Sequence, residues 1–206
     1  MDKVAIIVVT YKRQQLLSEL LDSFLKLTVA PWRVVVVDNE NSVETARVVE
    51  NFRERLNAYS ATALWHDGGD AVVYAPQTEN TGGAGGFSAG VQIAYEMGAD
   101  WFWLMDDDVV VIPDSLKRLV KWMPDHGVVQ GSRLDYDGGP FYWQYRFAST
   151  TPLPRRSSTS PASSRQTRHA LKAVCSVATS SRRSVFPTKG SSFTGMTVFT
   201  AISRAR

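Results

Sequence analysis

The sequence predicts an α/β domain with a mostly parallel β-sheet and flanking helices. Four apolar runs alternate with segments of helical periodicity, which is the order expected of a parallel sheet with right-handed crossovers. Each apolar run ends in a short polar cluster, and ligands bind beyond the carboxyl ends of the strands in sheets of this class. The fold class therefore also predicts where a site should lie.

The strands are predicted from continuous apolar runs, which indicate burial on both faces of a sheet. The first run, VAIIVV, is too short to span a membrane and suits a central strand. In chain order, strands are expected at residues 4–9, 34–37, 72–75, 101–105 and 127–131.

The helices are predicted from apolar residues that recur at three- and four-residue spacing. Pro31 bars the first helix from continuing, Asn41 and Glu44 suggest a capping box for the second, and Pro113 opens the last. In chain order, helices are expected at residues 16–25, 41–56, 87–97 and 113–122.

The charge distribution divides the chain into a domain over residues 1–147 and a basic tail over residues 148–206. All 20 acidic residues lie in residues 1–137 with 12 basic ones, a net charge of −8, whereas the last 69 residues carry 11 basic residues and no acidic one, a net charge of +11. The tail is rich in Ser, Thr, Arg and Pro, and we expect it to be largely irregular.

Cysteine content and hydropathy exclude two classes of protein. Cys175 is the single cysteine, so the chain has neither a disulfide framework nor a cysteine metal cluster. No apolar stretch reaches the roughly 18 residues that a membrane span needs. We expect a cytoplasmic protein, with peripheral contact to the inner face of the cell membrane as an alternative.

Polar clusters follow four of the predicted strands. These are Thr10-Tyr11, Asp38-Asn39, Asn80 with the following glycines, and Asp106-Asp107-Asp108. Because the carboxyl ends of parallel strands meet at one edge of the sheet, the four clusters are expected to converge.

The acidic triplet predicts a divalent cation. Three adjacent carboxylates repel one another unless a positive charge lies among them, and Mg²⁺ or Mn²⁺ takes one or two carboxylates together with substrate phosphates. On an extended segment alternate residues point the same way, so Asp106 and Asp108 would face the metal and Asp107 would point elsewhere.

Glycines 82, 83, 85 and 86 precede a predicted helix. Their backbone N–H groups could approach a diphosphate, although a tight strand-to-helix connection explains them equally well. A dinucleotide-binding domain would carry its glycines in the first strand-to-helix turn, and residues 10–13 contain none.

The ordered set of motifs resembles the inverting glycosyltransferases of family 2, which have the GT-A fold. The resemblance covers about residues 3–147 and is similar above all to the galactofuranosyltransferase branch, with rhamnosyltransferases as neighbours. The motifs that carry it are VVTYKR, VVVVDN, ENTGGAGGFSAG and WLMDDDV.

The resemblance implies roles for several residues. Nucleotide-sugar binding is implied for Thr10, Tyr11, Arg13, Asp38, Asn80, Gly83, Asp106 and Asp107, and Mn²⁺ or Mg²⁺ binding for Asp106 and Asp108. The expected function is transfer of a sugar, galactofuranose from a UDP-sugar, to a cell-surface glycan or lipid-linked acceptor in cell wall biogenesis. The alternatives are a rhamnosyltransferase that uses a dTDP-sugar, or an inactive nucleotide-sugar-binding protein.

The catalytic base has no candidate in the sequence. The family carries it on an acidic segment well after the triplet, and no carboxylate side chain follows Asp137 here. We expect that the tail is out of frame, since the codons of Met196 and Thr197 read GAC, or Asp, in a shifted frame. A genuine basic arm that binds nucleic acid or anionic lipid is the less favoured explanation, so no nucleic-acid partner is expected.

Overall fold

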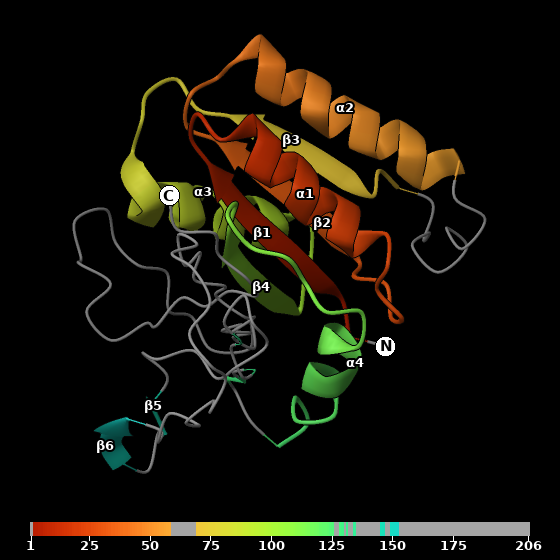
Figure 1. The fold of residues 1–206 in the computed structure, drawn as a ribbon, viewed down its shortest axis with the longest axis vertical. Coiled ribbons are helices and arrows are strands. Elements are labelled where there is room, and N and C mark those ends of the chain that lie inside the picture. The colour runs from red at the N-terminus through yellow and green to blue at the C-terminus, as the bar shows by residue number, and fades with distance from the viewer. Residues whose placement is uncertain are drawn as a thin grey trace, which may run out of the picture.

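The computed structural model describes residues 2–58, 69–125, 128–129, 131, 134, 145–146 and 149–152. Four parallel strands form the central sheet in the order β3-β2-β1-β4 (Figure 1). In chain order the main elements are β1 (Val4–Thr10), α1 (Gln14–Phe24), β2 (Arg33–Asp38), α2 (Val43–Ala58), β3 (Val72–Pro76), α3 (Gly82–Glu96), β4 (Trp101–Asp106) and α4 (Ser115–Val120). The predicted α/β fold with a parallel sheet and flanking helices is confirmed.

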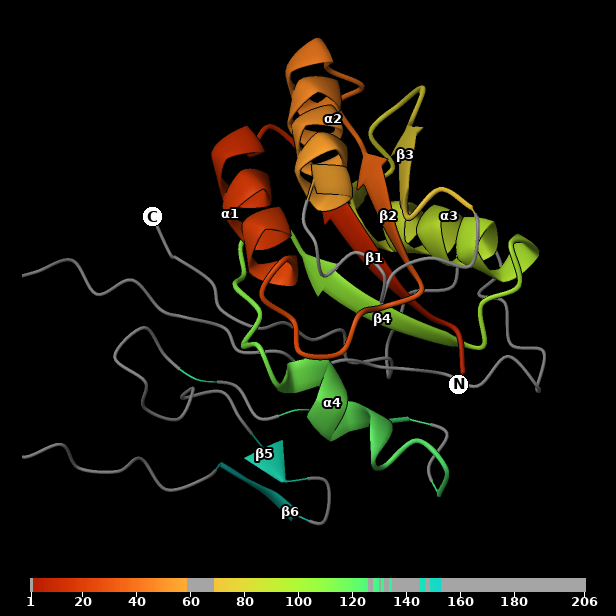
Figure 2. The same ribbon diagram turned by 90° about the vertical axis from the view of Figure 1, so that its right-hand side faces the viewer.

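Helices cover both faces of the sheet. Helices α1 and α2 lie on one face and α3 lies on the other, as two perpendicular views agree (Figures 1 and 2). Successive residues of β1 alternate between the two cores, because side chains of a strand point to opposite faces. Ile6 and Val8 pack in the core under α1 and α2, whereas Ile7 and Val9 pack in the core under α3.

Helix α3 approaches the sheet closely because two of its glycines face the sheet. A Cβ atom at Gly90 would lie 2.3 Å from Cγ2 of Ile7, and one at Gly86 would lie 2.6 Å from Cγ1 of Val9. No larger side chain fits at these positions without movement of the sheet residues. This close approach brings the amino end of α3 beside the carboxyl ends of β1 and β2.

Several predicted boundaries are corrected. Helix α3 begins five residues earlier than expected, because the glycine-rich residues 82–86 form its first turns and are not a separate loop. The hydroxyl of Ser42, and not Asn41, caps α2 by accepting the Thr45 amide at 3.1 Å, and Asn41 has a left-handed φ of 55°.

The last predicted elements also differ. The described residues of the predicted strand 127–131 (128, 129 and 131) have no strand conformation. Antiparallel strands β5 (Tyr145–Arg146) and β6 (Ser149–Pro152) pair instead, so the segment expected to be irregular begins with a strand. The rest of the tail, with the proposed frame change, lies outside the described residues.

Candidate functional site

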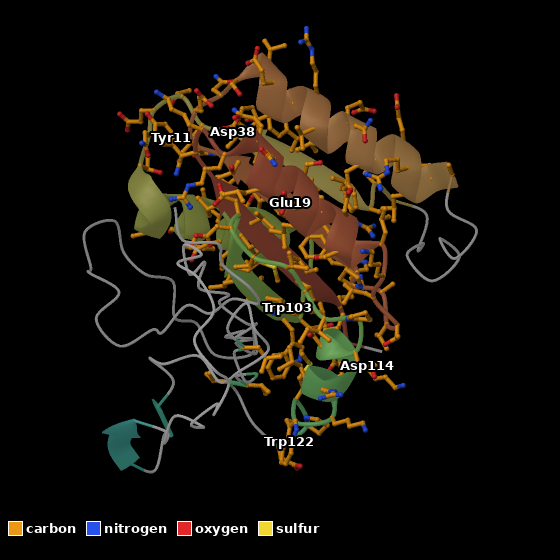
Figure 3. The ribbon with its side chains drawn as sticks, in the orientation of Figure 1. Tyr11, Glu19, Asp38, Trp103, Asp114 and Trp122 are labelled. Atoms are coloured by element: carbon orange, nitrogen blue, oxygen red, sulfur yellow. The ribbon has the colours of Figure 1, made fainter. Side chains whose placement is uncertain are left out.

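The polar clusters meet at the carboxyl edge of the sheet. Thr10 and Asp38 are the last residues of β1 and β2 and are partners in the strand register. The amide of Asn39 donates to the Thr10 carbonyl at 3.0 Å, and its side-chain amide donates to the Gly82 carbonyl at 3.1 Å. Figure 3 shows Tyr11 and Asp38 at this same end of the sheet, away from Trp103 and α4.

The acidic triplet joins the edge through Asp107. Its carboxylate accepts a 2.7 Å hydrogen bond from the Thr10 hydroxyl, and Asp107 is only 3% exposed. Burial raises the pKa of Asp107 to about 6, although the Thr10 hydrogen bond and the Arg13 charge oppose that increase. Asp107 is therefore a constrained carboxyl group with a proton affinity well above normal.

One guanidinium nitrogen serves two carboxylates. Nη1 of Arg13 lies 3.2 Å from Oδ1 of Asp107 and 3.4 Å from Oδ2 of Asp108. The strict alternation expected over the triplet does not hold, because β4 ends at Asp106 and the next two residues form a bend. Asp107 does not point away from Asp108 in this bend, since both carboxylates reach the same cationic atom.

The donor set fits a divalent cation that shares its coordination with a substrate. The two carboxylate oxygens of Asp107 and Asp108 converge on one positively charged atom, and carboxylate oxygens are the ligands that Mg²⁺ and Mn²⁺ prefer. Among the described residues, no group of three acidic, His or Cys side chains is arranged to hold a metal. Phosphate oxygens would have to complete the coordination. Metal binding by Asp106 and Asp108 stays a prediction, and Asp106 is partly buried at the end of β4.

Asp38 is anchored entirely within the protein. This buried carboxylate accepts the backbone amides of Glu40 at 2.9 Å and Ser42 at 3.0 Å, and the hydroxyl of Tyr74 at 2.7 Å. Burial, and then the hydrogen bond to Asp38, raise the pKa of the Tyr74 hydroxyl, so Tyr74 remains a protonated donor at neutral pH. Asp38 thus shapes the loop after β2 while being 0% exposed.

The remaining predicted residues lie in the loops around this edge. Tyr11 is exposed, and the ammonium of Lys12 lies 5.1 Å from its ring centre. The Asn80 side chain accepts the Gly82 amide at 2.9 Å, which fixes the entry into α3. No atom lies within 4 Å of a Cβ built on Gly83, so the space beside its backbone is open.

Sequence reasoning missed two residues of this edge. Tyr74 lies within an apolar strand, and its role depends on the register that pairs it with Val36 beside Asp38. Gln14 donates to Glu40 at 2.9 Å and to the Ser42 and Thr45 hydroxyls at 3.3 Å, which ties α1 to the start of α2. A tyrosine within a buried strand is itself a signal, because its hydroxyl needs a partner.

The model of the family described as "Glycosyl transferase family 2" matches residues 5–186. The chain belongs to this family. It is 35% identical over 105 residues to the galactofuranosyltransferase GlfT1 of Mycolicibacterium smegmatis, a match that covers 51% of this chain and 30% of that enzyme. The present chain thus spans less than a third of the length of that relative.

Solved structures share the fold of this family 2 member. S. aureus TarS 1–349 in complex with UDP-GlcNAc aligns with a TM-score of 0.50 and 22% identity, over 69% of this chain and 38% of TarS. The mannosyltransferase PcManGT from Pyrobaculum calidifontis, in complex with GDP-Man and Mn²⁺, aligns with a TM-score of 0.49 and 24% identity, over 65% and 35% of the two chains. No helix among the described residues is long and apolar enough to cross a membrane.

Proposed function

We propose that this chain forms the donor-binding part of an inverting glycosyltransferase that uses a nucleotide diphosphate sugar. The observation that carries the proposal is the meeting of Thr10, Arg13 and the acidic triplet at the carboxyl edge of the sheet, in a chain of glycosyl transferase family 2. This edge therefore offers a positive charge for a diphosphate, from Arg13, and negative charges for its counter-ion, from the acidic triplet.

The described residues divide into two groups around the donor. Tyr11 presents an exposed ring for a nucleobase or ribose. The open backbone at Gly83 lies in the first turn of a 15-residue helix whose N-terminus favours phosphate. Asp106 and Asp108 would hold Mn²⁺ or Mg²⁺, with Asp107 beside them. When bound, the metal would supply Lewis-acid neutralisation of the negative charge that develops on the departing diphosphate.

The transfer itself is a displacement at the anomeric carbon. The acceptor hydroxyl forms the new glycosidic bond, the bond between the anomeric carbon and the phosphate oxygen breaks with its electron pair on the nucleoside diphosphate, and a base takes the hydroxyl proton. No described residue is proposed as that base. The base belongs to a part of the enzyme beyond this edge.

The donor is proposed to be UDP-galactofuranose and the acceptor a cell-surface glycan or its lipid-linked precursor. Support comes from the galactofuranosyltransferases that this chain resembles over half its length. TarS, which shares the fold, was solved with UDP-GlcNAc, in keeping with a uridine nucleotide. Tighter binding of dTDP than of UDP would favour a rhamnosyltransferase.

Calorimetric titration with UDP in the presence and absence of Mn²⁺ tests the donor site. We expect Mn²⁺-dependent binding in the wild-type chain and a loss of about tenfold or more in Asp108→Ala, because one of few metal ligands is removed. Asp100→Ala is the matched control, since its exposed carboxylate accepts the Lys3 amide at the opposite edge of the sheet. Unchanged Mn²⁺-dependent affinity in Asp108→Ala would refute the metal role.

An inactive nucleotide-sugar-binding protein is the second candidate function. The observation in its favour is that no Asp or Glu follows Asp137 in the sequence. Metal-dependent UDP binding without transfer of galactofuranose to a glycan acceptor would establish it. Transfer by the chain as it stands would eliminate it.

A further inference from the structure

Arg13 is the exposed member of the acidic site, and its two carboxylate partners are largely buried. The side chain of Arg13 is 49% exposed, whereas those of Asp107 and Asp108 are only 4% and 11% exposed. Asp107 is held further by the buried Thr10 hydrogen bond. Arg13 can therefore leave through solvent while the carboxylates stay in place.

The contact between Arg13 and the carboxylates uses only part of the guanidinium. A single nitrogen, Nη1, makes both contacts with the carboxylates, at 3.2 and 3.4 Å, which are long for charge-assisted hydrogen bonds. A guanidinium has five N–H donors in a planar fork that suits phosphate oxygens. The observed contact thus offsets part of the carboxylate charge without using the geometry in which arginine binds most strongly.

We propose that Arg13 is an exchangeable counter-ion of the donor site. In the donor-free protein its single positive charge offsets part of the charge of Asp107 and Asp108. On donor binding it leaves them, so that the divalent cation can bind at the acidic triplet, and moves to the diphosphate. The proposal rests on the proposed function and adds a residue that links metal binding to donor binding. In the donor complex, Arg13 and the divalent cation together would offset part of the charge of the carboxylates and the diphosphate.

The exchange predicts opposite effects on two affinities. Without nucleotide, Mn²⁺ must displace Arg13, so Arg13→Gln is expected to bind Mn²⁺ about 3- to 10-fold more tightly. With saturating Mn²⁺, the same variant lacks a phosphate ligand and is expected to bind UDP about 3- to 10-fold more weakly. Damage to the fold would weaken both affinities, so the opposite signs distinguish exchange from a structural role.

Lys12→Gln is the matched control for long-range charge. It removes one positive charge from the adjacent position, whose ammonium lies over the Tyr11 ring. The Lys12→Gln variant is expected to change Mn²⁺ affinity less than twofold, if the effect of Arg13→Gln depends on contact with the carboxylates. Calorimetric Kd values for Mn²⁺ alone and for UDP with Mn²⁺ are measured on wild type and both variants, with circular dichroism to confirm folding.

The results separate failure of the exchange from failure of the donor site. Arg13→Gln with unchanged or weaker Mn²⁺ affinity, or Lys12→Gln with an equal gain, overturns the exchange while leaving the donor site intact. Wild-type protein that shows no Mn²⁺-dependent binding of UDP overturns the proposed function itself. Tighter Mn²⁺ binding with weaker UDP binding in Arg13→Gln alone supports the exchange.

Discussion

The hydroxyl of Thr10 donates a 2.7 Å hydrogen bond to Oδ2 of Asp107, which joins the last residue of β1 to the first residue after β4. The two residues are 97 positions apart in the chain. Their contact is buried and holds the acidic triplet against the end of the central strand. The burial of Asp107 at this position also gives the folded chain a measurable dependence on pH.

Folding stability should depend on the protonation of Asp107. Its pKa is raised from 3.8 to about 6, so the folded chain binds this proton more tightly than the unfolded chain. The stabilising contribution is complete below about pH 4 and is lost as the pH rises through about 6. Over this window the loss should be on the order of 3 kcal/mol.

Urea denaturation of wild type and Asp107→Asn at pH 4 to 7 measures this contribution. The variant cannot titrate at this position, so its free energy of unfolding should rise relative to wild type between pH 4 and pH 6. Asp100→Asn, at an exposed site, should follow the wild-type curve. Parallel curves for wild type and Asp107→Asn would show that Asp107 has an ordinary proton affinity.

Tyr74→Phe should destabilise the loop that Asp38 anchors. The substitution removes one of three donors from a fully buried carboxylate, and such a loss costs about 1–3 kcal/mol. Tyr11→Phe, which removes the hydroxyl of an exposed tyrosine and keeps the ring that Lys12 contacts, should change stability by less than about 0.5 kcal/mol. Chemical denaturation compares them, and equal effects would deny Tyr74 a special role.

Two glycines of α3 should respond differently to alanine. Gly90→Ala places a methyl group 2.3 Å from Ile7 in the core and should cost about 1–3 kcal/mol of folding stability. Gly83→Ala meets no atom within 4 Å and should leave stability unchanged or raise it by up to about 1 kcal/mol.

UDP titration of Gly83→Ala separates an effect on donor binding from an effect on helix packing. Gly83→Ala should weaken UDP binding despite its stable fold, because the methyl group would occupy the space proposed for the donor. If Gly83→Ala binds UDP as the wild type does, the donor does not approach this backbone.

The coding sequence should reveal a change of reading frame after about codon 140. Reading the nucleotides across codons 140–206 in the shifted frame should give Asp from the codons of Met196 and Thr197, within an acidic segment that includes the missing base. A stop codon before that point, or the absence of acidic residues, would leave the basic tail as the genuine sequence.

The sequence predicted the boundaries of the four strands of the central sheet better than those of the helices, although the strand expected at residues 127–131 was wrong for the residues described there. Apolar runs such as WFWLM have sharp polar ends, so β4 was placed to within one residue. The start of α3 was missed because glycine is a poor helix former, and here it is retained for close packing of Gly86 and Gly90 on β1. In α3, packing against the sheet therefore outweighs the low helix propensity of glycine.

The convergence of the polar clusters was also predictable, since parallel topology requires it. The side-chain partners of the residues at this edge could not be predicted from the sequence. That Tyr74 meets Asp38, and that Arg13 lies between Asp107 and Asp108, depends on strand register and on the bend after β4. Spacing along the chain does not contain this information.

The sheet order has a consequence for how the protein is made. Strand β4 is the last of the four to leave the ribosome, yet it pairs with β1, the first to leave it. A nascent chain that has not reached residue 108 can assemble β1, β2 and β3 but carries none of the three carboxylates. The ability to bind donor should therefore arise in one step during synthesis, when β4 docks beside β1, and shorter nascent chains should bind none.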